Sequence, residues 1–511
     1  MKRKGKFWVG MTSILALATL SACSEGSTEA ETKEEKLSIV TTFYPMYDFT
    51  KNIVGDTADV ELLIPAGTES HDYEPSAKDM AKIHDADVFV YHNENMETWV
   101  PSAEKSWSEG EPNIVQGTEG MILLPGDDEG HTHDHDHSEE GHTHELDPHT
   151  WVSPNRAIQE VESITEQLVE LYPEKAEQFE TNAEKYLKKL TTLDEEYTNS
   201  LANAKQTSFV TQHAAFGYLA LDYGLTQVSI AGLTPDEEPS AKRIAELKTY
   251  VADNEINYIY FEENASDKIA TTLANEANVE LEVLNPLEGL TTEQMEAGED
   301  YISVMEENLQ ALEKTTGVAS KEVHPEEEEA TEKTVAEGYF EDSQVADRTL
   351  SDYAGTWRSV YPLLESGELD QVFDYKAKLN KDMTAAEYKD YYTVGYKTDV
   401  TDITIDEDTI EFVVDGKQSK YTYKSSGYEI LTYEKGNRGV RFTFETDDPD
   451  AGNFKYVQFS DHEIAPTDSA HFHIYFGGES QEALYEEVDN WPTYYPSELS
   501  DEEIAQEMMA H

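Results

Sequence analysis

The sequence predicts two domains of different class, an α/β domain followed by a mainly β domain. Over residues 37–312, short apolar runs alternate with amphipathic stretches of helical period, which favours mainly parallel sheets covered by helices. After residue 337, short aromatic and β-branched runs follow one another with glycine-containing turns between them, which favours an antiparallel barrel or sandwich. A length of 511 residues is enough for two or three domains of ordinary size.

The composition excludes one class of partner and leaves another open. Lys and Arg number 37 against 106 Asp and Glu, so the formal net charge is −69, and hydrophobic residues make up 38%. That apolar content is enough for packed cores. The acidity argues against nucleic acid, because the chain lacks the cations needed to neutralise a run of phosphates. It is compatible with a cation partner, although a solvated acidic surface is the simpler explanation.

The N-terminus has the features of a secretion signal. Basic side chains cluster in the first six positions, and residues 7–20 form an apolar stretch that is shorter than a membrane span. The stretch ends in Leu20-Ser21-Ala22-Cys23, which resembles a bacterial lipobox, in which the cysteine is lipidated after cleavage. We therefore expect a signal peptide over 1–22, a lipid anchor at Cys23 and a polar tether over 23–36. The alternative is an ordinary signal peptide with an incidental cysteine.

The single cysteine also limits the metal chemistry. Because Cys23 is the only cysteine, the rest of the chain has no thiol for disulfide, redox or thiolate–metal chemistry. Any metal site must therefore be built from histidines and carboxylates.

The elements of the first domain follow from hydrophobic period. Strands are expected at residues 37–43, 60–64, 88–92, 208–211, 256–261 and 279–284, and helices at 76–85, 155–171 and 241–254. One helix is longer than the others, because apolar residues recur every three or four positions at Phe179, Ala183, Tyr186, Leu190, Leu193, Tyr197 and Leu201. At about 1.5 Å per residue it would run roughly 40 Å, long enough to span two lobes.

A linker and a series of strands complete the chain. Residues 313–336 are rich in Lys, Glu, Thr and Pro, which is typical of a linker or a poorly ordered helix. Strands are then expected at residues 401–405, 409–414, 420–423, 428–433, 440–445, 454–459 and 472–476. Asp415-Gly416, Ser426-Gly427 and Gly436-Asn437 provide turns between them.

The histidines gather in three places, of which the first is a loop at 127–145. Six of its residues are histidines interleaved with acids, namely His131, His133, His135, His137, His142 and His144. Such a segment cannot build a core, but its imidazoles suit a borderline metal. We expect it to capture metal ions.

Three isolated histidines follow or precede regular elements of the first domain. His71 lies in a loop after a predicted strand, His149 lies just before a predicted helix, and His213 follows the strand at 208–211. In open α/β sheets, ligands bind where the loops at the carboxyl ends of strands converge. A single histidine of this kind is usually structural, but three in equivalent loops predict a common site. The Glu262-Glu263 pair, which follows a predicted strand, is suggestive of the edge of a site, although acidic residues are abundant in this chain.

These same segments resemble a known family. Residues 37–312 resemble the ZnuA-like cluster A-I substrate-binding proteins of metal ABC transporters, through Thr42-Phe43-Tyr44-Pro45, Gly67-Thr68-Glu69-Ser70-His71-Asp72-Tyr73-Glu74-Pro75, Asp147-Pro148-His149-Thr150-Trp151, Gln212-His213-Ala214-Ala215-Phe216 and Asn285-Pro286-Leu287-Glu288. The resemblance implies two α/β lobes joined by one long helix. It also implies metal ligands at His71, His149 and His213, with Glu288 as an acidic fourth ligand at a position that varies within the family.

The ligand set favours zinc. Three imidazoles and one carboxylate suit tetrahedral Zn²⁺, whereas Mn²⁺ prefers more oxygen ligands. Manganese-binding relatives in this family have a carboxylate where His213 stands, and the histidine-rich loop also points to the zinc-binding members.

The third group of histidines lies in the second domain. His471 and His473 are two residues apart on a predicted strand and so face the same side, and His462 follows the preceding strand. The alternative is two half-buried strand histidines without a ligand. Residues 337–511 resemble the ZinT-like, calycin-type zinc-binding domains, through residues 357–364 and 469–477. The resemblance implies zinc ligands at all three histidines, and the whole chain resembles the AdcA-type zinc-binding lipoproteins. The remaining histidines His84, His92, His324 and His511 are expected to have surface or packing roles.

We therefore expect a zinc receptor and not an enzyme. It would be a monomer, lipid-anchored at the cell surface, that captures Zn²⁺ and delivers it to the permease of an ABC importer, with the C-terminal site aiding acquisition. The alternatives are a surface zinc-dependent hydrolase and a metal-stabilised adhesin. No His-Glu-x-x-His or Gly-x-Ser-x-Gly motif is present in the sequence, which disfavours the hydrolase.

Overall fold

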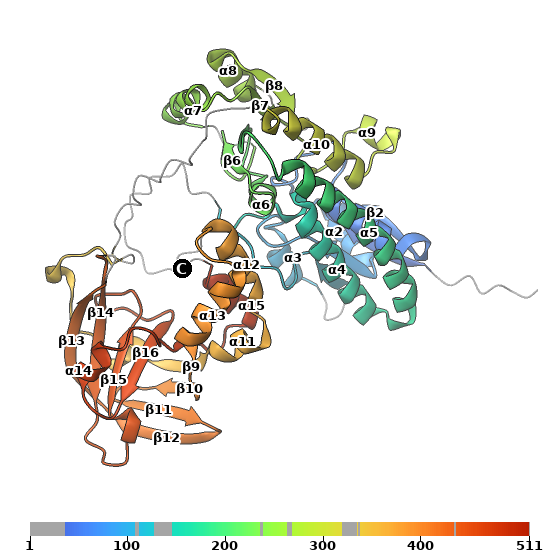
Figure 1. The fold of residues 1–511 in the computed structure, drawn as a ribbon. Helices are drawn as coiled ribbons and strands as arrows, with labels where there is room; N and C mark the ends of the chain where they lie inside the picture. Colours follow the sequence, from blue (N-terminus) through green and yellow to red (C-terminus); the bar gives the residue numbers. More distant parts are fainter. Residues whose placement is uncertain are drawn as a thin grey trace, which may run out of the picture. The chain divides into compact units, whose positions relative to one another are not determined.

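The computed structural model describes residues 36–107, 112–126, 146–235, 239–262, 268–318, 335, 338–433 and 436–509 (Figure 1). The predicted lipidation site Cys23 lies outside these residues. So do the six loop histidines His131, His133, His135, His137, His142 and His144. Within the described part of the chain, no helix combines the length and apolar character needed to cross a bilayer.

The first domain contains two four-stranded parallel sheets, one in each lobe. The first sheet has the order β2-β1-β3-β4 and is formed by β1 (Leu37–Thr41), β2 (Ala58–Leu62), β3 (Val88–Tyr91) and β4 (Asn113–Gln116). The second has the order β6-β5-β7-β8 and is formed by β5 (Ser208–Thr211), β6 (Thr226–Ser229), β7 (Tyr258–Phe261) and β8 (Glu280–Val283). The expected α/β class is therefore confirmed, and strands β4 and β6 are additions to the sequence prediction.

Helices cover these sheets. The first lobe carries α1 (Tyr44–Val54), α2 (Ala77–Asp85) and α3 (Val100–Glu104). The second lobe carries α6 (Gly217–Asp222), α7 (Ala241–Asp253), α8 (Lys268–Ala277), α9 (Thr292–Ala297) and α10 (Tyr301–Thr316). Capping boxes begin several of them, as at Ser76 with Asp79 in α2.

One long helix joins the lobes, as the sequence predicts. Helix α5 (Ala176–Leu201) packs beside α4 (Pro154–Leu171) and contacts α1 of the first lobe and α10 of the second. Its buried residues are the seven of the predicted apolar stripe, Phe179, Ala183, Tyr186, Leu190, Leu193, Tyr197 and Leu201. Because α5 buries this stripe against both lobes, one hydrophobic cluster extends through the two lobes, and each lobe has a smaller cluster besides.

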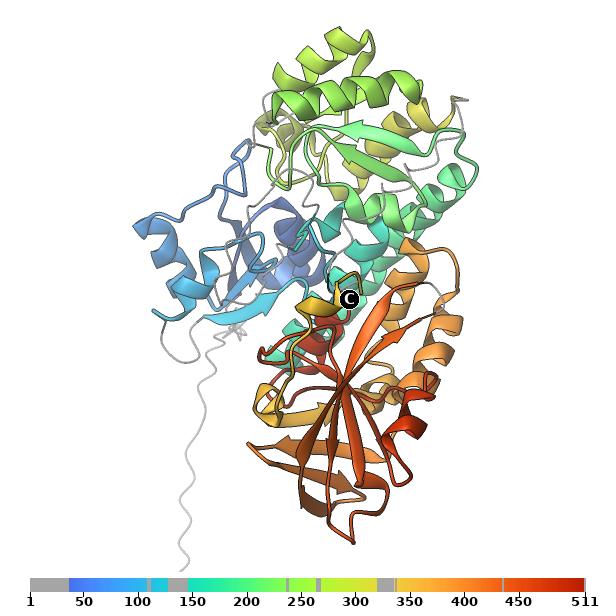
Figure 2. The same ribbon diagram turned by 90° about the vertical axis from the view of Figure 1, so that its left-hand side faces the viewer.

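The second domain is one curled antiparallel sheet of nine strands (Figure 2). Its order is β12-β11-β10-β9-β17-β16-β15-β14-β13, from β9 (Gly355–Ser359), β10 (Val400–Ile405), β11 (Thr409–Val414), β12 (Lys417–Thr422), β13 (Lys424–Thr432), β14 (Arg438–Glu445), β15 (Tyr456–Ser460), β16 (Phe472–Gly477) and β17 (Thr493–Pro496). Only Tyr423 separates the edge strands β12 and β13, yet the described residues form no ladder between them. The calycin-like domain is therefore an open half-barrel and not a sandwich.

Helices that the strand pattern did not predict accompany this sheet. They are α11 (Tyr361–Ser366), α12 (Asp370–Leu379), α13 (Ala385–Tyr396), α14 (Gln481–Tyr485) and α15 (Asp501–Glu507). Helix α13 is rich in tyrosine, a residue with strand preference, but Thr384 and Glu387 form a capping box that begins a helix.

Hydrophobic packing continues from the first domain to the second. Ile122, Leu124 and Tyr218 belong to one buried cluster with residues of α12, α13 and α15. The Gln506 side-chain amide donates to the carbonyl of Leu123 at 2.8 Å and accepts from its N–H at 2.8 Å. The segment that leads into the histidine-rich loop is therefore held by the second domain.

Candidate metal centres

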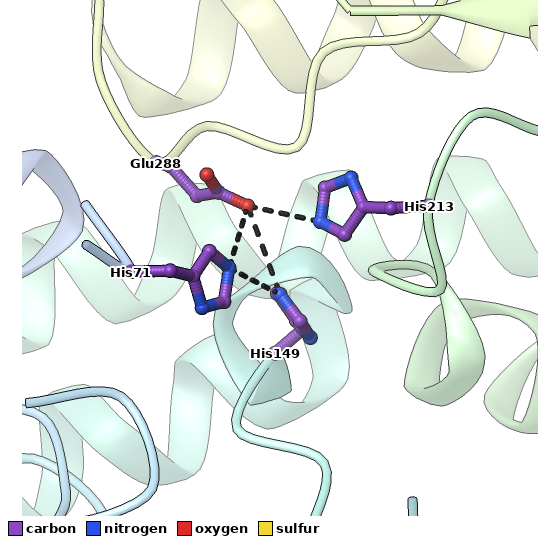
Figure 3. Close-up of side chains that lie close together, drawn as sticks. All are labelled: His71, His149, His213 and Glu288. Carbon is purple, nitrogen blue, oxygen red and sulfur yellow. Dashed lines mark hydrogen bonds and ion pairs between the residues drawn. The ribbon is translucent and has the colours of Figure 1, made fainter. Parts of the chain in front are cut away.

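The structure brings the four residues of the first predicted site together. His71 lies in the loop after β2, His149 precedes α4, and His213 and Glu288 follow the carboxyl ends of β5 and β8. Figure 3 shows their side chains converging on one point. Each offers one ligand atom, and all four atoms lie within 4.8 Å of one another.

The distances between these atoms suit a tetrahedral ion. His71 Nε2 and His149 Nε2 are 3.2 Å apart. Glu288 Oε1 lies 3.1 Å from His213 Nε2, 3.4 Å from His71 Nε2 and 3.7 Å from His149 Nε2. Ligand bonds of about 2.0–2.1 Å to zinc place the corners of a tetrahedron roughly 3.3 Å apart. The four residues are therefore spaced as a zinc shell requires.

The site is buried and leaves polar atoms unsatisfied. The side chains of His149 and His213 are fully buried, and that of Glu288 is 8% exposed. Among the described residues, His213 Nε2 and Glu288 Oε1 have no hydrogen-bond partner. Such orphaned buried atoms are rare, and a bound cation satisfies both of them.

Two carboxylates behind the ligands orient the imidazoles. His149 Nδ1–H donates to Asp147 Oδ1 at 2.7 Å, and His213 Nδ1–H donates to Glu262 Oε1 at 2.6 Å. Each bond leaves the Nε2 lone pair directed toward the site. No role was predicted for Asp147 from the sequence, and Glu262 was expected only as part of an acidic pair suggestive of a site edge. The position of Glu262 directly after strand β7 was the sequence feature that indicated a role in the site.

The charges around the first site favour the ionised forms of His213 and Glu288. Burial alone would lower the pKa of His213, but Glu262 and Glu288 outweigh it and raise that pKa well above its usual value. Burial would raise the pKa of Glu288, but His71 and the neighbouring imidazoles lower it well below the usual range. Glu288 therefore remains an ionised ligand.

Hydrogen bonds between the loops enclose the site. Ser70 Oγ donates to the carbonyl of Glu288 at 3.1 Å, and Gly67 N–H donates to that of Leu290 at 3.1 Å. Trp151 Nε1–H donates to the carbonyl of Pro286 at 2.7 Å. These bonds link the loop of the first lobe, and the segment before α4, to the segment that carries Glu288.

His92 supports the segment beneath the ligands. Its buried Nε2–H donates to the carbonyl of Pro148 at 2.6 Å, and its Nδ1 lies 3.6 Å from Glu160 Oε2. Burial lowers the pKa of His92 to about 3 and raises that of Glu160 to about 8. His92 is therefore a neutral residue with the packing role that the sequence suggested.

The second domain brings its three histidines together as well. His462, His471 and His473 have ring centroids 5.7–5.8 Å apart and form a second candidate metal group. In the β15–β16 hairpin, Ser460 at the end of β15 pairs with His473 of β16. His462 follows Ser460 by two residues and therefore lies close to the strand that carries His471 and His473. His462 has a φ of 66°, so the chain turns sharply at this ligand.

A buried ion pair fixes the turn that presents His462. Arg348 donates to both oxygens of Asp461 at 2.6 and 2.7 Å, and Ser469 Oγ donates to Asp461 Oδ2 at 2.7 Å. Since Asp461 precedes one ligand and Ser469 lies two residues before another, this network ties the two segments together.

The second site differs from the first in its ligand set. No described carboxylate joins the three histidines in this group. Within the described residues, these histidines supply three of the four positions of a tetrahedral zinc ion. The site opens into a cavity of about 190 Å³, and His462 is exposed.

Comparisons with known proteins give a matching family for each of the two domains. Residues 39–315 match the family model described as zinc-uptake complex component A, periplasmic, and residues 331–511 match the one described as ZinT (YodA) periplasmic lipocalin-like zinc-recruitment. The chain is 62% identical over 501 residues to the zinc-binding lipoprotein AdcA of Streptococcus pneumoniae serotype 4, covering 98% of this chain and 99% of that protein.

One further relative and one solved structure extend this result. The zinc-binding protein AdcA of Streptococcus pyogenes serotype M3 is 58% identical over 491 residues, covering 94% of this chain and 95% of the relative. The crystal structure of Zn(II)-bound AdcA from Streptococcus pneumoniae has a TM-score of 0.85 at 62% identity, covering 93% of this chain and all of that one.

Proposed function

Because the chain belongs to the AdcA family of zinc-binding proteins, which combine a zinc-uptake component A with a ZinT domain, we propose that it captures zinc and supplies it to an ABC importer. Both family models describe zinc uptake or recruitment, and neither describes an enzyme. The observation that carries the proposal is the buried tetrahedral group of His71, His149, His213 and Glu288.

The division of the first site between the lobes supplies a means of release. His71 belongs to the first lobe, whereas His213 and Glu288 belong to the second. A closed four-ligand site releases metal slowly, so delivery requires that the shell be broken. Separation of the lobes would pull Glu288 from His71 and break the Ser70–Glu288 hydrogen bond.

The three histidines of the second domain would form an auxiliary zinc site. The exposed position of His462 suits rapid capture of zinc. A site on the same chain raises the local concentration of zinc near the first one. The histidine-rich loop at 127–145 would act in the same way.

Zinc titration of the chain without its signal peptide tests both sites. Wild-type protein should bind zinc tightly at the first site and more weakly at the second. Replacing His149 and His213 with alanine should remove the tight site only, and replacing His471 and His473 should remove the second. His84→Ala changes an exposed histidine and serves as the control. Tight binding that survives the loss of His149 and His213 would contradict the proposal.

A cellular experiment tests import and anchoring. We propose that Cys23 carries the lipid, that the monomeric protein remains at the outer face of the cell membrane, and that an ABC permease receives the zinc. Cys23→Ala should release the protein into the medium. Deleting the protein should slow growth in chelated medium, and zinc should restore growth. Unchanged zinc uptake in a strain that lacks this protein and its homologues would refute the import role. An adhesin would show that result while keeping its metal sites.

A further inference from the structure

Residues 120–124, the strap, follow β4 and are held by the second domain. The Gln371 side-chain amide of α12 makes two hydrogen bonds to backbone groups of the strap, and the Tyr375 hydroxyl of the same helix makes a third, at 2.8–3.3 Å. Gln506 of α15 adds its two bonds of 2.8 Å to the strap backbone. The strap is therefore a backbone segment of the first domain that the second domain fixes in place.

Tyr218 of α6 links the strap to the segment that carries His149. Its fully buried hydroxyl accepts from the N–H of Leu124 at 2.8 Å and donates to the carbonyl of Asp147 at 2.8 Å. The N–H of Asp147 donates to the carbonyl of Leu124 at 2.9 Å, so three hydrogen bonds join the two segments. Burial raises the pKa of Tyr218 well above its usual value, and the phenol therefore keeps the single proton that it directs at Asp147.

Asp147 passes this restraint to the ligand. Its Oδ1 accepts from the main-chain N–H of His149 at 2.9 Å and from the ring Nδ1–H at 2.7 Å. Its Oδ2 lies against the first residue of α6, where a Cβ added to Gly217 would stand only 2.9 Å away. A shift of Asp147 would therefore turn the imidazole of His149 away from the other ligand atoms, because one carboxylate oxygen holds both its backbone and its ring.

The surroundings of these bonds are apolar. Ile122, Leu124 and Tyr218 belong to one buried cluster with Tyr375 and other residues of the second domain. A hydrogen bond lost in such a cluster leaves a buried N–H or carbonyl without a partner, which costs more than the loss of an exposed bond. The contacts from the second domain to Asp147 are therefore strong restraints on position.

We propose that Tyr218 is a positioning residue of the first metal site, and that the second domain stabilises the orientation of His149 by holding the strap. The inference rests on the proposed binding of zinc at the first site. It extends that function, because it gives the second domain a role at the first site besides its own group of histidines. Zinc release from the first site should then depend on residues outside the ligand group.

Zinc binding by Tyr218→Phe tests the role of the tyrosine. The protein is the chain without its signal peptide, carrying His471→Ala and His473→Ala so that the second group is removed. Affinity is measured by chelator competition, and release by stopped-flow exchange with a chelator. Tyr218→Phe should lower affinity and speed release about fivefold, as the loss of one hydrogen bond of typical strength does. Tyr197→Phe is the matched control, because it removes an equally buried hydroxyl that donates to the carbonyl of Met305 at 2.6 Å.

Two further measurements distinguish positioning from a general loss of stability. Tyr218→Phe should have a smaller effect in an Asp147→Asn background, because the restraint then no longer reaches His149 through a charged acceptor. Cobalt(II) bound at the first site should show shifted visible bands in Tyr218→Phe and unchanged bands in Tyr197→Phe, since the bands report the arrangement of the ligands. The same chain with His149→Ala and His213→Ala gives the contribution of the histidine-rich loop.

Paired variants of α12 and α15 test the role of the second domain. Gln371→Ala with Gln506→Ala removes four hydrogen bonds to the strap and should speed zinc release from the first site about threefold, less than Tyr218→Phe, because the strap stays bonded to its partner segment. Adding Tyr218→Phe should give the release rate of Tyr218→Phe alone, since both changes act on one restraint. Gln206→Ala is the control, because its side-chain amide also holds two backbone groups, but at the end of β5 opposite His213.

The outcomes separate this inference from the function on which it rests. If the first site binds zinc and Tyr218→Phe behaves as Tyr197→Phe does, the positioning role is wrong and the zinc site stands. If Tyr218→Phe speeds release and the paired glutamine variant does not, the support by the second domain is wrong. If the first site takes up no zinc before any of these changes is made, both proposals fail.

Discussion

The two candidate metal centres of this chain differ in the charge of the groups that would surround a zinc ion. The first encloses four ligand atoms, one of them the carboxylate of Glu288, and places Asp147 and Glu262 behind two imidazoles. Among the described residues, the second has three imidazoles, no carboxylate in the group and a lysine in its cavity. If both proposed sites bind zinc, the first should therefore hold it more tightly and the second should exchange it faster.

The contacts behind the ligands show the same contrast. His213 is oriented by a buried carboxylate, whereas His473 Nδ1–H donates to the hydroxyl of Thr493 at 2.7 Å. A hydrogen bond to a charged acceptor is roughly twice as strong as a neutral one. Both the affinity of the first site and its dependence on its supporting residues should therefore be greater.

Removing the fourth ligand of the first site should have the largest effect. Glu288→Ala leaves three histidines, as in the second site, and should lower zinc affinity by more than about 100-fold, beyond the range typical of residues behind the ligands. Zinc release should also become faster, which stopped-flow exchange with a chelator measures. Glu293→Gln, at an exposed position nearby, is the control. An unchanged release rate would show that the ligand count does not explain the difference between the sites.

Removing a carboxylate behind a ligand should have the next largest effect. Glu262→Gln keeps the shape of the side chain but removes the charge that orients His213, and it should lower zinc affinity of the first site about 10- to 100-fold. Competition titration measures the change. An affinity equal to that of the wild type would show that the His213 imidazole is held by its packing alone.

The buried acid beneath the first site should make stability depend on pH. Burial raises the pKa of Glu160 to about 8, against about 4.3 in an unfolded chain. The folded chain then binds the extra proton between these values, so stability falls as pH rises through that window. Glu160→Gln has no carboxyl group to ionise and so does not lose stability in this way. The difference in unfolding free energy between Glu160→Gln and wild type should therefore shift in favour of the variant by about 2 kcal/mol between about pH 6 and 8.

Urea unfolding of the metal-free proteins measures this effect. Glu166→Gln, on the exposed side of the same helix, should show no such trend relative to wild type. A Glu160→Gln difference that is constant with pH would mean that Glu160 is already ionised in the folded chain.

The supporting residue of the second site should have the smallest effect. Thr493→Val keeps the size of the side chain but removes the acceptor of the His473 bond, so zinc affinity at that site should fall about fivefold. The first site should be unaffected, which titration of both sites in one protein checks. If Thr493→Val lowered zinc affinity as much as Glu262→Gln does, the hydrogen bonds that orient His473 and His213 would not differ in importance.

Elements with strong local signals were predictable from the sequence. The seven apolar residues of α5 are buried as their period indicated, because a stripe of this width has to face a core. Strands β4 and β6 were missed, since each has four residues and little apolar character. Helix α13 was missed because its tyrosines favour strands, and only the capping box revealed its start.

The amino-acid sequence by itself determined the chemistry available to this protein. Its single cysteine, its three groups of histidines and its alternating apolar runs specified imidazole and carboxylate ligands on an α/β domain and a β domain. The resemblance singled out Glu288, but tertiary structure alone showed that Asp147 and Glu262 lie behind the imidazoles, because acidic residues are so numerous that none is distinguished by type. Folding buries Glu262 against His213, places Glu288 among three imidazoles and leaves Lys376 beside three others. Burial and short distances determine which of these charged side chains interact strongly, and no local sequence pattern encodes them.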